Sequence, residues 1–218
     1  FPLYESAENT GLTMMQQSCS MTPIRGDDGT ITSIAITVQD VTSGVILERR
    51  LRRMNQVDGL TGAYNRRFLD SRLEEEVERH RRYKRTLSVV MMDIDYFKDI
   101  NDRYGHLEGD AVLQRLTETV RRELRGSDIF CRYGGEEFVM VLPETPEGDA
   151  AELAERVRRR VEETPFGEAV EEYRITASFG CTSLSEEVAT AEALVAEADR
   201  NLYRAKDAGR NRVGRSGS

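Results

Sequence analysis

Residues 128–141 read DIFCRYGGEEFVMV, two apolar runs on either side of a glycine pair. The runs 128–132 and 137–141 predict two strands, and the residues between them predict a hairpin turn. Adjacent glycines permit a tight turn and let a ligand approach the backbone closely. The acids that follow, Glu136 and Glu137, would place one carboxylate on each face of the second strand. Taken alone, the stretch is better explained as a glycine turn with solvated acids.

The sequence around this hairpin alternates between strand and helix patterns. Further strands are predicted at 87–92 and 173–180, and a loop is predicted from Asp93 to Gly109. Helices are predicted over residues 65–83, 109–124, 148–162 and 191–208. The order β-α-β-β-α-β within this run predicts an α/β (α+β) sandwich, with an antiparallel-containing sheet and helices on one or both of its faces.

The first 57 residues have a different pattern. A β-branched run at 31–38 and the Asp-Gly step before it predict a hairpin within residues 1–43. A hairpin alone is not a domain, so we expect it to be covered by chain outside this sequence or by another chain. A helix is predicted over 45–56 with an apolar seam formed by Leu47, Leu51 and Met54. The seam fits a linker helix packed on its own chain and a dimerising signal helix equally well.

The composition excludes several classes of protein. The chain has 218 residues, 39% of them hydrophobic and 32% charged, and a net charge of −8. This charge disfavours a nucleic-acid polymer as partner. No apolar run approaches the ~18 residues of a membrane span, and no P-loop motif is present. The three separated cysteines suit the reducing cytosol. Because the chain begins at Phe1, membrane attachment of a longer protein through N-terminal segments stays open.

The stretch MDIDYFK at 92–98 ends a predicted buried strand with alternate carboxylates. Asp93 and Asp95 would lie on the same side of the chain. Carboxylates at a strand end suit Mg²⁺, which takes one or two protein oxygens and completes its shell with water and phosphate. An aspartate that caps the following turn is the simpler explanation of this pair alone.

Two further groups have polar side chains suited to a nucleotide. Asn101 and Asp110 are of the right types to read guanine, because a carboxylate accepts from N1–H and N2–H₂ together and an amide both donates and accepts. Each also fits a turn or a cap, with Asp110 capping a helix at Ala111. Lys206 and Arg210 lie four residues apart at a helix end, where they suit a polyphosphate or simply the helix C-terminus.

Together these motifs resemble the GGDEF diguanylate cyclase domain over residues 58–213. They occur in the family's order and spacing, which makes chance agreement negligible. The matching segments are DGLTGAYNRR at 58–67, with Ala63 where leucine is usual, DIDYFKDINDRYGHLEGD at 93–110, GGEEF at 134–138, and Lys206 with Arg210.

The resemblance implies a fold like the adenylyl cyclase catalytic core and the polymerase palm. It implies condensation of two GTP into cyclic di-GMP with release of two pyrophosphates. One domain would bind one GTP, so a homodimer would complete the reaction. Two Mg²⁺ or Mn²⁺ ions per site would be held by Asp93, the Ile94 carbonyl and Glu136.

The resemblance also assigns the remaining site residues. Glu137, with Asp93 and Glu136, would be catalytic. Guanine would be read by Asn101 and Asp110, with His106 in the same segment. The phosphates would be bound by Phe97, Lys98, Lys206 and Arg210.

An inhibitory site for the product is implied by RGSD at 125–128, five residues before the glycine pair. Arg125 and Asp128 match the family's Arg-x-x-Asp site, and Arg156 on the next helix would be a secondary contact. The alternative is an ordinary surface Arg–Asp pair, worth little.

Residues 20–43 resemble the closing hairpin of a PAS sensor domain, through TPIRGDDGT at 22–30 and DVT at 40–42. The implied organisation is a C-terminal sensor remnant at 1–43, a signalling helix at 44–57, the cyclase domain at 58–213 and a tail at 214–218. The rival hypothesis is an inactive module that binds GTP or cyclic di-GMP. Retention of Asp93, Glu136 and Glu137 disfavours that rival, and Asp110 favours guanine over adenine.

Overall fold

The computed structural model describes residues 15–25, 27, 29–46, 56–167 and 171–215. The chain divides into two compact units, residues 1–55 and 56–218. Within the described parts, no helix is long and apolar enough to cross a membrane.

The first unit contains a two-stranded antiparallel hairpin, β1 (Gln17–Arg25) and β2 (Ile31–Asp40). Gly29 in the turn has φ 78°, as the Asp-Gly step predicts. Cross-strand partners share a face, and Met21 pairs with Ile36 while Cys19 pairs with Val38. One face of the hairpin is therefore apolar, and its large side chains are exposed. Residues 42–46 are helical, and the predicted seam of Leu47, Leu51 and Met54 lies outside the described residues.

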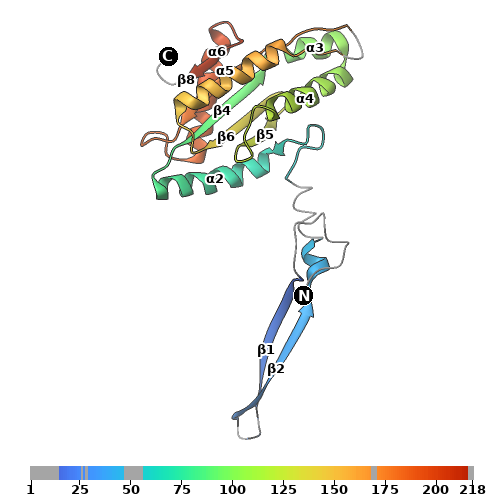
Figure 1. The fold of residues 1–218 in the computed structure, drawn as a ribbon, viewed down its shortest axis with the longest axis vertical. Helices are drawn as coiled ribbons and strands as arrows, with labels where there is room; N and C mark the ends of the chain where they lie inside the picture. The colour runs from blue at the N-terminus through green and yellow to red at the C-terminus, as the bar shows by residue number, and fades with distance from the viewer. Residues whose placement is uncertain (1–14, 26, 28, 47–55, 168–170, 216–218) are drawn as a thin grey trace. The chain divides into compact units, whose positions relative to one another are not determined.

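The second unit is a six-stranded mixed sheet with helices on both faces, shown in Figure 1. Its strand order is β3-β5-β6-β4-β7-β8. The strands are β3 (Tyr64–Asn65), β4 (Leu87–Ile94), β5 (Ile129–Gly134), β6 (Glu137–Pro143), β7 (Ala177–Ser183) and β8 (Val213–Arg215). The four central strands are antiparallel, and β3 and β8 join the edges in parallel. The α/β sandwich with an antiparallel-containing sheet is confirmed.

The helices fall into two layers. They are α2 (Arg66–Tyr83), α3 (Phe97–Tyr104), α4 (His106–Arg121), α5 (Glu147–Glu163) and α6 (Ala191–Asp207). Residues of α3, α4 and α5 pack on Val90, Met92 and Ile94 of β4. Residues of α2 and α6 pack on Val89 and Met91 of the same strand. The alternation along β4 therefore directs Asp93 to the face that α2 and α6 cover.

The structure corrects the prediction of a loop between Asp93 and Gly109. That segment contains α3, and α4 begins at His106. α3 gave no periodic signal because Phe97 is its only buried residue, and it starts after Tyr96, whose φ is 58°. Asp110 lies inside α4, so the alternative that it caps a helix at Ala111 is wrong.

The strand predicted at 173–180 begins only at Ala177. Tyr173 forms an isolated bridge with Phe166 instead of joining the sheet. Gly209 follows α6 with φ 113°, which agrees with its predicted place at the helix C-terminus.

Candidate active site

Asp93 lies near the end of β4 and is 6% exposed. Its Oδ2 is 2.8 Å from Nζ of Lys206, which α6 brings to the same face of the sheet. Burial raises the pKa of the Asp93 carboxyl to about 6, while the hydrogen bond and charge of Lys206 act in the opposite direction. Lys206, which was predicted to bind the phosphates, thus forms an ion pair with Asp93.

Glu137 is the cross-strand partner of Asp93 on β6, so the two carboxylates share a face. Burial raises the pKa of Glu137, and the charge of Lys206 opposes this. Glu136 lies in the turn before β6, and its charge raises the pKa of Asp93. Both acids therefore act on Asp93 through their charge, whereas the sequence predicted one carboxylate on each face of the second strand. It was wrong to place Glu136 on the second strand, because β6 begins one residue later.

The opening motif holds the glycine turn in place. Arg132 donates from Nε to the Gly135 carbonyl at 2.9 Å and forms an ion pair with Asp58 at 3.0 Å. Asp58 also accepts from the Thr61 hydroxyl at 2.7 Å. Burial opposes ionisation of Asp58, but the hydrogen bonds from Thr61 and Arg132 outweigh it and lower its pKa. Sequence reasoning quoted Asp58 only as part of a motif, and this contact gives it a structural role beside the acids.

The donor set fits a divalent cation. Asp93 already faces the Lys206 ammonium group, and carboxylate oxygens are the ligands that Mg²⁺ prefers. Within the described parts of the chain, no group of three or more His, Cys, Asp or Glu side chains is arranged to hold a metal ion. Asp93, Glu136 and the Ile94 carbonyl would supply the few protein ligands that Mg²⁺ uses when a phosphate completes its shell.

Asp95 is held by two hydroxyl groups at the entry to β7. It is 4% exposed and accepts hydrogen bonds from the hydroxyls of Thr176 and Ser178, both at 2.7 Å. Both oxygens of Asp95 are used in these contacts, whereas Asp93 faces Lys206, so the two aspartates have different partners. Asp95 instead ties β4 to β7, a role that the spacing of two aspartates did not reveal.

The residues predicted to read guanine lie on α3 and α4, two helices that pack together at Asn101 and Gly109. Asn101 of α3 packs against Gly109 of α4, where a Cβ atom would overlap the Asn101 Oδ1. The same Cβ would lie 3.3 Å from Cζ of Phe97. His106 and Asp110 are exposed on α4. The motif contained Gly109 without an assigned role, and the structure shows that the position of Asn101 leaves no room for a Cβ there.

The cationic residues predicted for the phosphates lie around the end of β4. Lys98 is exposed on the first turn of α3. The Arg210 guanidinium lies 4.6 Å from the ring centre of Tyr96 and donates to its hydroxyl at 3.4 Å. Tyr96 directly follows Asp95, so the structure brings Arg210 beside the segment that carries Phe97 and Lys98.

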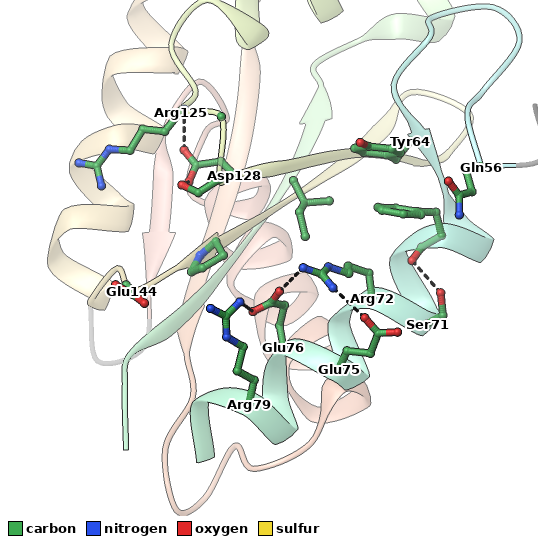
Figure 2. A pocket seen from close by; sticks show the side chains of 15 residues that line it. Gln56, Tyr64, Ser71, Arg72, Glu75, Glu76, Arg79, Arg125, Asp128 and Glu144 are labelled. Carbon is green, nitrogen blue, oxygen red and sulfur yellow. Dashed lines mark hydrogen bonds and ion pairs between the residues drawn. The ribbon is translucent and has the colours of Figure 1, made fainter. Parts of the chain in front are cut away.

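Arg125 and Asp128 line a separate cavity of about 830 Å³, shown in Figure 2. The Arg125 backbone N–H donates to Asp128 Oδ2 at 2.8 Å. Arg72, Glu76 and Arg79 of α2 form the opposite wall. This wall was not predicted, because no sequence motif connects α2 with the turn before β5.

Arg156 is not among the residues that line this cavity. Its Nε donates to Glu123 Oε2 at 2.9 Å, and Arg160 binds the other oxygen of Glu123 at 3.1 Å. The hydrogen bonds to Arg156 and Arg160 lower the pKa of Glu123 despite its desolvation. The ion pair therefore holds Arg156 on Glu123, which lies two residues before Arg125, and Arg156 stays outside the residues that line the cavity.

Comparison with known proteins gives the class that this fold and site define. The family described as "Diguanylate cyclase, GGDEF domain" matches residues 55–212. The chain belongs to this family.

Relatives and solved structures agree with this assignment. The chain is 42% identical over 158 residues to the response regulator PleD of Caulobacter vibrioides, covering 72% of this chain and 35% of that protein. It is 44% identical over 162 residues to the diguanylate cyclase DgcP of Pseudomonas aeruginosa, covering 74% and 24%. The GGDEF domain of DgcB from Caulobacter crescentus, solved with cyclic di-GMP, superposes with a TM-score of 0.72 at 31% identity, covering 75% and 94%. The chain thus spans about a third or less of the length of these two curated relatives.

Proposed function

We propose that this chain condenses two GTP molecules into cyclic di-GMP and two pyrophosphates. The observation that carries the proposal is the buried Asp93 carboxylate, with Glu137 opposite it, Glu136 in the adjacent turn and Lys206 at 2.8 Å. Several acids and a cation at one strand end suit transfer of a nucleotidyl group. We expect the cyclase domain to span residues 58–213, with a tail at 214–218.

Asp93, the Ile94 carbonyl and Glu136 would hold two Mg²⁺ or Mn²⁺ ions. Such ions lower the pKa of an attacking hydroxyl and stabilise charge on a phosphate and its leaving group. Glu137 lies on the same face as Asp93 and would maintain the negative field that attracts cations. Lys206, which contacts Asp93, would move to the outer phosphates when a cation takes its place.

Substrate selection would come from the α3–α4 junction and from the turn after α6. Asn101 and Asp110 would read the guanine edge, with His106 beside them. Lys98 and the backbone at Phe97, which begins α3, would bind phosphate at a helix N-terminus. Arg210 would bind the outer phosphates from its place on Tyr96.

The product is cyclic, so each 3′-hydroxyl must reach the α-phosphate of the other GTP. A single domain with one GTP site cannot supply both, and we propose a homodimer that brings two sites face to face. The helix over 44–57 would control this encounter. The seam that could pair in such a dimer lies outside the described residues, so the sequence pattern alone supports this step.

We further propose that the cavity at Arg125 and Asp128 binds cyclic di-GMP and inhibits the enzyme. A cavity of about 830 Å³ is large enough for a cyclic dinucleotide. Arg125 would bind phosphate or guanine, and Asp128 would accept from guanine. Arg156 would be a secondary contact that first has to leave Glu123.

The N-terminal hairpin is proposed to be the end of a PAS-like sensor domain. Its apolar face, with Met21 and Ile36 in register, is exposed in this chain and fits a surface that the rest of a sensor would cover. The hairpin lies before the residues that match the cyclase family. A cytoplasmic cyclase attached to an upstream sensor, with or without a membrane anchor, follows from this proposal.

Incubation of the purified chain with GTP and Mg²⁺, with ATP as control, tests the proposed reaction. Chromatography should show cyclic di-GMP from GTP and no product from ATP. A version with a dimeric coiled coil fused ahead of Val45 separates a failure to dimerise from a failure of chemistry. Absence of product from the fused dimer, with GTP still bound, would favour the inactive binding module.

A further inference from the structure

The chain reverses direction directly after α6, at residues 209–211. Gly209, Arg210 and Asn211 have φ values of 113°, 62° and 46°. Side-chain-bearing residues adopt this region at a cost, and they remain in it where the surroundings hold them. The position of Arg210 therefore depends on the contacts that hold this turn.

Asp95 makes one of these contacts. Its Oδ2 accepts from the Asn211 backbone N–H at 3.0 Å as well as from the Thr176 hydroxyl, and its Oδ1 accepts from Ser178. The Asp95 backbone N–H donates to the Thr176 carbonyl at 2.9 Å. Hydrogen bonds to an ionised carboxylate are stronger than neutral ones, and both oxygens of this buried group are used.

The Asn211 side chain holds the same turn from the other side. Its Nδ2 donates to Glu162 Oε1 at 2.8 Å, and its Oδ1 accepts from Arg158 at 2.7 Å. The hydrogen bonds that Arg158 donates to Glu155 and Glu162 raise the pKa of Arg158 and favour its charged form. The turn is thus fastened to α5 and, through Asp95, to the end of β4.

These contacts decide where Arg210 lies. Its guanidinium rests on Tyr96, the residue directly after Asp95. Asp95 is also two residues from Asp93. The segment 93–96 therefore contains the buried Asp93, the Tyr96 ring that contacts Arg210, and the Asp95 carboxylate that accepts a hydrogen bond from the Asn211 backbone N–H.

We propose that Asp95 is a positioning residue for the GTP triphosphate: its hydrogen bond to the Asn211 amide holds Arg210 beside the strand end that carries Asp93. The inference deepens the proposed function and rests on it, because it takes Arg210 to bind phosphate. An Asp95 that only stabilised the fold would act on GTP binding independently of Arg210.

A double-mutant cycle tests this role through nucleotide binding, measured by calorimetry in the presence of Mg²⁺. The variants are Asp95→Ala, Arg210→Ala and the double mutant, with GTP and GMP as ligands. We expect Asp95→Ala to lower GTP affinity about tenfold, the scale of one hydrogen bond to a charged group. GMP affinity should stay within about twofold, since GMP lacks the outer phosphates. The double mutant should bind GTP as Arg210→Ala does. The exposed Asp149→Ala is the matched control.

Additive losses in the double mutant, or equal losses for GTP and GMP, would overturn the positioning role. If Asp95→Ala fails to fold, Asp95→Asn enters the same cycle. Asparagine keeps the shape and one acceptor but loses the charge, so a smaller loss that is again absent in an Arg210→Ala background is expected.

Amide hydrogen exchange at Asn211 in the nucleotide-free protein gives a second measurement. Replacement of Asp95 should accelerate exchange at Asn211, and an unchanged rate would overturn the inference while leaving the proposed function intact. A wild-type chain that binds GTP no better than GMP would overturn the proposed function and the positioning role together.

Discussion

At the scale of single residues, Asp93 is subject to opposing influences. Burial favours its neutral form, and the nearby charges of Glu136 and Glu137 act in the same direction. Lys206 favours the ionised form from 2.8 Å. A divalent cation would meet a carboxylate that already has a cationic partner, so binding exchanges one cation for another and leaves no charge buried alone.

Glu136→Gln tests the metal assignment. The substitution keeps the size of the side chain and removes its charge, so we expect cyclic di-GMP formation to be abolished. Turnover is measured by chromatography at saturating GTP and Mg²⁺. The exposed Glu187→Gln serves as control and should retain wild-type activity. Retained turnover in Glu136→Gln would overturn the metal assignment.

Gly109→Ala tests the packing of Asn101, the residue proposed to read guanine. A Cβ at this position overlaps the Asn101 Oδ1, so Asn101 must move, and we expect the GTP KM to rise about tenfold, the cost of one misplaced hydrogen bond. Stability should not fall, because alanine favours a helix over glycine.

Gly148→Ala on α5 is the matched control, since a Cβ there meets nothing within 4 Å. Steady-state kinetics and urea unfolding are measured for both variants. An unchanged KM in Gly109→Ala would show that Asn101 does not read the base from its observed position.

At the scale of elements, close packing of α6 on β7 positions Lys206. A Cβ at Gly180 of β7 would overlap the Ala198 carbonyl and the Leu202 amide nitrogen of α6, and would lie 2.8 Å from Cα of Leu202. These are backbone atoms, which cannot rotate away from the added methyl group as a side chain can. Asn201 adds a hydrogen bond from its Nδ2 to the Cys181 carbonyl at 2.8 Å. The helix is therefore held at one distance from the sheet.

Gly180→Ala should destabilise the protein by about 2 kcal/mol or more, because overpacking forces a helix away from its strand. The free energy of unfolding is measured in urea, with Gly148→Ala again as the control. A loss below about 0.5 kcal/mol, the range of surface substitutions, would mean that α6 shifts freely on the sheet.

The turn between α4 and β5 is the element that would couple product to activity. Arg125→Ala should relieve inhibition and raise the yield of cyclic di-GMP in long incubations, because the guanidinium that would bind product is gone. Progress curves with added cyclic di-GMP provide the measurement.

Arg122→Ala, three residues earlier at the end of α4 and outside this cavity, is the control for loss of a nearby exposed charge. Equal product inhibition in Arg125→Ala and in the wild type would contradict the assignment of the inhibitory site.

At the scale of the whole molecule, the chain consists of two units, and the proposed reaction needs two copies of the second. The described domain carries one copy each of the buried Asp93 with its neighbouring acids, the α3–α4 junction proposed to read guanine, and the turn at Arg210 proposed to bind phosphate. Activity should therefore depend on association of chains as well as on the geometry within one chain.

The specific activity should rise with protein concentration and level off once dimers dominate, as mass action requires. Turnover is measured over a series of dilutions alongside the molar mass from light scattering. A coiled coil fused ahead of Val45 should remove the concentration dependence. Constant specific activity in a monomeric sample would contradict the dimer requirement.

The sequence by itself determined the class of fold and the order of the central strands and helices, and it supplied the acids of the proposed site. Periodicity reveals an element when many of its residues are buried, as in β4, where every residue is buried. α3 stayed hidden because it buries only Phe97. Motif spacing predicted a site at Glu136 and Glu137 because the glycine turn and the strand that follows are local in sequence.

Only the tertiary structure decided which distant groups meet. The pairing of Asp93 with Lys206, the packing of Asn101 on Gly109 and the capture of the Asn211 amide by Asp95 each depend on how helices and strands pack. Asp95 and Asn211 are separated by 116 residues, so local sequence patterns cannot predict their contact. Side-chain types and spacing specify the chemistry that is available, whereas sheet register and helix packing decide which groups share a site.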